Sequence, residues 1–92
     1  MRRFRGRLSD DAGLITGDVW GQIAENMIED KLRCHGTIRI PVSASTRAFL
    51  ADSPRVVCTD GFTILIDSLE EEPGVHRRWT KLKFAGHGMP VR

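Results

Sequence analysis

Side chains that could bind a metal ion are scattered along the chain. Cys34 and His35 are adjacent, whereas Cys58, His76 and His87 each lie far from them in sequence. Thiolates and imidazoles are ligands that zinc prefers, but these spacings are not those of a zinc finger or zinc knuckle. The two cysteines form no CxxC pair either. We therefore expect no metal site and no cofactor, and the two unpaired thiols favour a reducing, cytoplasmic compartment.

Residues that could support nucleophilic catalysis lack the motifs that usually accompany it. Ser43 and Ser45 carry hydroxyl groups, but no nucleophile elbow or comparable motif surrounds them. The glycines of GLITGDVWG, residues 13–21, match neither the dinucleotide-binding fingerprint nor the P-loop. The sequence therefore favours a protein that is not an enzyme, and it indicates no small-molecule substrate.

Basic residues form the most concentrated chemical feature of the sequence. Four arginines occur in the first eight residues, MRRFRGRL, although the formal net charge of the whole chain is only +2. A second concentration, HRRWTKLKF at residues 76–84, surrounds a tryptophan with arginines and lysines. Cationic side chains contact phosphates, and an aromatic ring offers a surface on which a base can stack. These segments predict binding to nucleic acid or to an acidic protein surface.

Length and composition predict one small globular domain. The chain has 92 residues, of which 40% are hydrophobic and 28% charged, a balance that disordered chains do not have. The longest apolar run, residues 64–66, is far shorter than the roughly 20 residues of a membrane-spanning helix. We expect a single domain over residues 1–85, a loosely ordered tail over residues 86–92 and no membrane partner.

Apolar periodicity predicts where the helices and strands lie. Residues 3–8 alternate, with Phe4 and Leu8 on one side and arginines on the other, which predicts a strand. Residues 18–34 instead repeat apolar side chains every three or four positions, which predicts an amphipathic helix. A short second helix is expected over residues 45–52, and strands over 37–42, 55–59, 62–68 and 76–84.

Turn residues predict how the last strands pair. Asp60-Gly61 favours a two-residue type I′ hairpin, which would pair Val57 with Ile64. A three-residue loop near residue 74 would pair Ile66 with Leu82 and would also bring opposite charges together.

These elements predict an α+β fold. We expect a four- or five-stranded, mostly antiparallel sheet with the helix at about 18–34 packed on one face and the short helix at about 45–52. The core face would carry Phe4, Ile38, Ile40, Ile64, Ile66, Leu82 and Phe84.

The opposite face of this sheet is expected to be the functional one. If the first strand joins the sheet, that face collects the basic residues and a tryptophan: Arg3, Arg5, Arg7, Arg39, Arg77, Trp79, Lys81 and Lys83. This predicts a platform for nucleic acid or an acidic partner. The alternative is that the charges only protect the sheet edges from pairing with other chains. A disordered N-terminal arm would remove the shared face altogether.

Apolar side chains on the same predicted face support a second hypothesis. Val56, Leu65, Leu69 and Trp79, bordered by arginine, have the composition of an interaction patch. Such a patch would form a homodimer or receive a protein partner, unless the short helix or the tail covers it. The leading hypothesis is thus a basic binding module, and the alternative is an assembly module.

Overall fold

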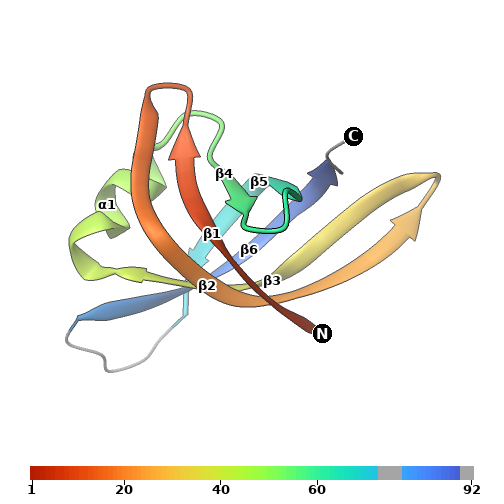
Figure 1. The fold of residues 1–92 in the computed structure, drawn as a ribbon, viewed down its shortest axis with the longest axis horizontal. Coiled ribbons are helices and arrows are strands. Elements are labelled where there is room, and N and C mark those ends of the chain that lie inside the picture. Colours follow the sequence, from red (N-terminus) through yellow and green to blue (C-terminus); the bar gives the residue numbers. More distant parts are fainter. Residues whose placement is uncertain (73–77, 90–92) are drawn as a thin grey trace.

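The computed structural model describes residues 1–72 and 78–89, which form six strands and one short helix (Figure 1). The elements are β1 (Arg2–Asp10), β2 (Gly13–Ile28), β3 (Lys31–Pro41), α1 (Val42–Leu50), β4 (Arg55–Cys58), β5 (Thr63–Glu71) and β6 (Trp79–Met89). The strands are antiparallel and close into a barrel in the order β1-β2-β3-β6-β5-β4. The expected α+β fold, an open sheet covered by a long helix, is therefore wrong.

Strand β1 closes the barrel because it pairs on both sides. Gly6 is the partner of Val19 in β2 and of Cys58 in β4. Phe4 and Leu8 point into the core and the arginines between them are exposed, which is the alternation that the sequence predicts. Since closure pairs both edges of the sheet, the core is enclosed by strands and needs no long helix to cover it.

Residues 13–41 form the β2–β3 hairpin, so the helix predicted over about 18–34 is wrong, whereas the predicted strand at 37–42 lies at the end of β3. Glu29 and Asp30 have φ angles of 51° and 62°, as the two central residues of a type I′ turn require. Gly21, inside the predicted helix, disfavours a helix by about 1 kcal/mol relative to alanine. The tip of this hairpin, orange and yellow in Figure 1, extends away from the rest of the barrel.

The apolar spacing that suggested a helix does not correspond to one buried stripe. Ile23 is buried in the barrel, but Trp20, Met27 and Ile28 are 36%, 66% and 55% exposed. Trp20 consequently lies on the outer surface.

The β4–β5 hairpin has a three-residue loop instead of the expected two-residue turn. Among the loop residues only Gly61 has a positive φ, 94°, and its N–H donates to the carbonyl of Cys58. A turn followed by a left-handed glycine is typical of three-residue hairpins. The extra residue shifts the register by one, so Val57 pairs with Thr63, and Val56 pairs with Ile64 inside the barrel.

The register of β5 and β6 also differs from the prediction. Ile66 pairs with Gly86 instead of Leu82, and Leu82 pairs with Glu71; a register shift also lies between Ile66 and Ser68. Strand β6 continues to Met89, so residues 86–89 belong to the barrel instead of the expected tail. The remainder of that tail, residues 90–92, lies outside the described part of the chain.

Helix α1 lies where the short second helix was expected, but it begins at Val42 and ends at Leu50. It contacts β2, β3 and β6, and its buried residues Ala44 and Ala48 join the core. All seven residues predicted for the core face are buried. No helix in the described part of the chain is long and apolar enough to cross a membrane.

Candidate functional site

Four adjacent strands, β1, β2, β3 and β6, present basic and aromatic side chains on the outside of the barrel. The strand register arranges these side chains in two rows, two residues apart. The first row contains Arg5, Trp20, Arg39 and Lys81, and the second contains Arg3, Gln22, Thr37 and Lys83. We call these eight residues, together with Trp79, the basic–aromatic face.

Trp20 and Trp79 contact each other at one end of this face. Their ring centroids are 4.6 Å apart, and the ring planes are inclined by 58°. Trp20 comes from β2 and Trp79 from the start of β6, with β3 between the two strands. Aromatic pairs at this separation stabilise each other. The contact therefore holds an aromatic surface in place beside the cations of the first row.

The cations of the face differ in their pairing. The guanidinium of Arg5 lies 3.0 Å from Asp18 Oδ1, and Lys81 Nζ lies 3.4 Å from Glu72 Oε2. Arg3, Arg39 and Lys83 form no ion pair with any other described residue. The Arg5–Asp18 pair is exposed and contributes about 1 kcal/mol or less, so an anionic ligand can replace this carboxylate at small cost.

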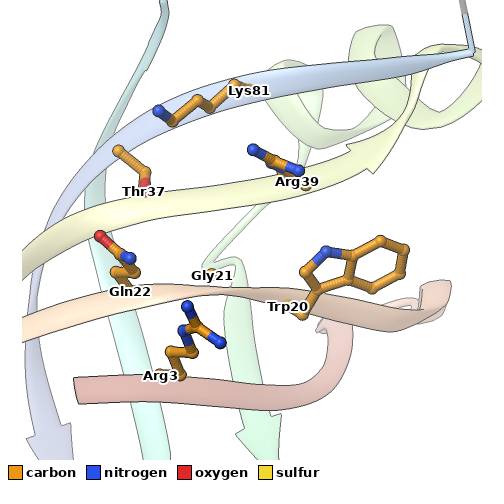
Figure 2. A pocket seen from close by; sticks show the side chains of 7 residues that line it. All are labelled: Arg3, Trp20, Gly21, Gln22, Thr37, Arg39 and Lys81. Carbon is orange, nitrogen blue, oxygen red and sulfur yellow. The ribbon is translucent and has the colours of Figure 1, made fainter.

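A shallow depression of about 360 Å³ lies within the basic–aromatic face. Figure 2 shows Arg3 at one edge of it and Lys81 at the opposite edge. Gln22 and Thr37 lie between these two cations at one end of the depression, and Trp20 and Arg39 lie at the other end. Within the described part of the chain, the Gln22 and Thr37 side chains form no hydrogen bonds. Two uncharged polar groups are thus available to a ligand between two cations.

Two of the predicted basic residues do not join the face. Arg7 is exposed on β1 beyond Arg5, but the register shift between Gly6 and Leu8 leaves it without a partner in β2, and it pairs with Val57 of β4 instead. Arg77 lies outside the residues that the structure describes. Of the predicted basic residues, Arg3, Arg5, Arg39, Lys81 and Lys83 are the ones that the strands bring together.

The predicted apolar residues do not form one surface with Trp79. Val56 is fully buried in the core, where no partner can reach it. Leu69 is half-buried and packs against that core, and Leu65 is half-buried opposite His87. The apolar interface predicted from the sequence is therefore not assembled on the outside of the barrel.

Sequence reasoning missed three residues of the face: Trp20, Gln22 and Thr37. Trp20 and Gln22 alternate with Val19, Gly21 and Ile23, a period of two that marks a strand. The helical interpretation of residues 18–34 hid this alternation and assigned Trp20 to the core.

The two cysteines are buried inside the barrel and unpaired. Burial raises the pKa of the Cys58 thiol to about 11, and the nearby charge of Asp60 adds to the increase. Burial and then the charge of Glu25 raise the pKa of Cys34. Both thiols are held in the neutral form, which is neither a nucleophile nor a metal ligand.

Alkaline pH should destabilise the fold through Cys58. Its pKa of about 11 exceeds the ordinary value of 9.0, so the unfolded chain loses this proton first as pH rises. The free energy of unfolding should be unaffected by this group below pH 9 and fall by ~2 kcal/mol between pH 9 and 11. Urea denaturation under reducing conditions measures this fall. If the free energy of unfolding of Cys58→Ala falls just as much, the Cys58 thiol is not its cause.

The basic–aromatic face combines three chemical capacities. Its cations can bind anions, its indoles can stack on planar rings, and Gln22 and Thr37 can donate and accept hydrogen bonds. No family model, curated protein or solved structure matches the chain.

Proposed function

We propose that the protein is a non-enzymatic, cytoplasmic module that binds single-stranded nucleic acid on the basic–aromatic face. The observation that supports this proposal most strongly is the contact between Trp20 and Trp79 on the outside of the barrel. Trp20 belongs to the row that holds Arg5, Arg39 and Lys81, and Trp79 lies beside that row. Proteins that bind single strands combine a cationic track for the phosphates with aromatic rings for the bases. Barrel surfaces are a common support for such sites.

The aromatic pair favours a single strand over a duplex. In a duplex the faces of each base are covered by its neighbours, so only an unpaired base can stack on an exposed indole. Trp20 is 36% exposed, which leaves part of its ring free for such a contact.

The charges favour phosphate as the group that the cations contact. Arg3 and Arg39 form no ion pair with the other described residues, so phosphates can approach them without displacing a carboxylate. Each phosphate neutralised on a single strand contributes about 0.7 to the slope of log affinity against log salt concentration. Affinity should therefore weaken as salt rises.

Titration of a fluorescein-labelled dT oligonucleotide, followed by anisotropy at several salt concentrations, tests this function. Arg39→Gln should weaken binding about fivefold to tenfold at low salt, since it removes a charge-assisted hydrogen bond worth roughly 1 kcal/mol. Its salt slope should be smaller by about 0.7. Arg7→Gln is the matched control, because Arg7 is also exposed on β1 but lies outside the face.

Two results would refute the proposed function. One is the absence of binding at low salt, and the other is binding that salt does not weaken. A salt-resistant homodimer free of nucleic acid would favour the assembly hypothesis instead, with the tryptophan pair as an aromatic anchor of a protein interface.

A further inference from the structure

The depression in the basic–aromatic face has dimensions and walls that suit one nucleotide. Its volume of about 360 Å³ lies at the small end of the range for ligand pockets, roughly 300–1,000 Å³. Gln22 and Thr37 are direct partners across β2 and β3, so their Cβ atoms are about 5 Å apart. Trp20 lines the depression next to them. A planar base entering here would meet hydrogen-bonding groups and an aromatic ring together.

Gln22 has the hydrogen-bonding pattern that complements adenine. A glutamine amide presents one donor and one acceptor side by side, which match N7 and the N6 amino group of adenine. Thr37 adds a hydroxyl that can donate or accept. Neither side chain has another hydrogen-bond partner in the described part of the chain. No Asp or Glu lines the depression, so the carboxylate acceptor typical for the cytosine amino group is missing there.

The cations around the depression are placed to contact the backbone of the strand. Arg3 is the partner of Gln22 on β1, and Arg39 lies two residues from Thr37 on β3 (Figure 2). A single strand that crosses the face from β1 to β3 would bring phosphates to both side chains while a base enters the depression.

We propose that this depression is a base-specific subsite that binds one adenine of the single strand through the amide of Gln22. Thr37 assists the base contact, and Arg3 and Arg39 contact the flanking phosphates. This inference rests on the proposed function, because it assigns base recognition within the same nucleic-acid site.

Competition between eight-nucleotide dT strands that carry a single central A, C or G tests the subsite. The strand with A should bind at least about fivefold more tightly than all-dT, since a bidentate contact discriminates by this factor or more. Gln22→Met keeps the length of the side chain and removes both hydrogen-bonding groups. It should abolish the preference for A, so that the strand with A and the all-dT strand bind the variant equally. Thr37→Val should reduce the preference without abolishing it.

The outcomes separate this inference from the proposed function. Equal binding of all four strands would overturn the subsite and leave the proposed function intact. A preference for A that survives Gln22→Met would have the same two consequences. A preference for G would show that an arginine faces the base, since arginine is the usual partner of guanine, and would overturn the role of Gln22. Failure of every strand to bind at low salt would overturn both.

Discussion

Gly21→Ala should lower the free energy of unfolding by about 3 kcal/mol or more. A methyl group at this position would lie 1.9 Å from the carbonyl oxygen of Thr37 and 2.9 Å from its carbonyl carbon. These are backbone atoms, which cannot rotate away as the end of a side chain can. Strands β2 and β3 would therefore have to separate at this position.

Gly17→Ala is the matched control for this substitution. Gly17 lies in the same strand, but a methyl group there would meet nothing within 4 Å. Replacing it should change stability by less than about 1 kcal/mol, because only the flexibility of the unfolded chain is altered. Urea denaturation followed by far-ultraviolet circular dichroism compares the two variants. Equal stability of both would show that the two backbones are not in close contact at Gly21.

Trp79→Ala should weaken binding of single-stranded DNA by about tenfold or more. Stacking of a base on an aromatic side chain contributes about 1–3 kcal/mol, and Trp79 also holds Trp20 in place through the ring contact at 4.6 Å. The same titration that tests Arg39 measures this loss. Salt dependence should be retained in the variant, because the cations of the face are unchanged.

Phe49→Ala is the matched control for the tryptophan. Phe49 is an aromatic side chain that is 43% exposed on α1, outside the basic–aromatic face. Its replacement should leave the affinity for DNA unaltered. Equal losses in Phe49→Ala and Trp79→Ala would indicate a general effect of removing aromatic surface and would contradict a specific stacking role.

Local alternation was sufficient to predict the strands whose pattern has a single interpretation. Phe4 and Leu8 on one side of β1, and Ile38 and Ile40 on one side of β3, leave no other regular element compatible with the sequence. Residues 18–34 fit both a helix and a strand, and the deciding turn uses Glu29-Asp30 instead of the Asn-Gly or Asp-Gly pair typical of type I′. Pairing with neighbouring strands in the folded barrel decided in favour of a strand.

Closure of the barrel could not be predicted from local sequence. It depends on Gly6 pairing with Cys58, residues 52 positions apart, and no turn or periodicity marks such a contact. One loop residue was also decisive, because the three-residue loop ending at Gly61 turns Val56 inward. An error of one residue in the register exchanges the side chains that face the core with those that face a partner.

The candidate site was predictable to the extent that it depends on alternation within β1, β3 and β6. The positions of Arg3 and Lys81 on outward faces follow from their apolar neighbours. Trp20 and Gln22 could be added only once β2 was known to be a strand. The part of the face that would contact a base is therefore the part that required the structure.

Titration of the intrinsic fluorescence with single-stranded DNA shows whether the strand binds on the basic–aromatic face. The chain contains two tryptophans, and both belong to the basic–aromatic face, so the emission reports on this site alone. At low salt, DNA should quench the emission as bases stack on the indoles, and added salt should restore it. Binding detected by anisotropy without any change in tryptophan emission would contradict the claim that this face is the site.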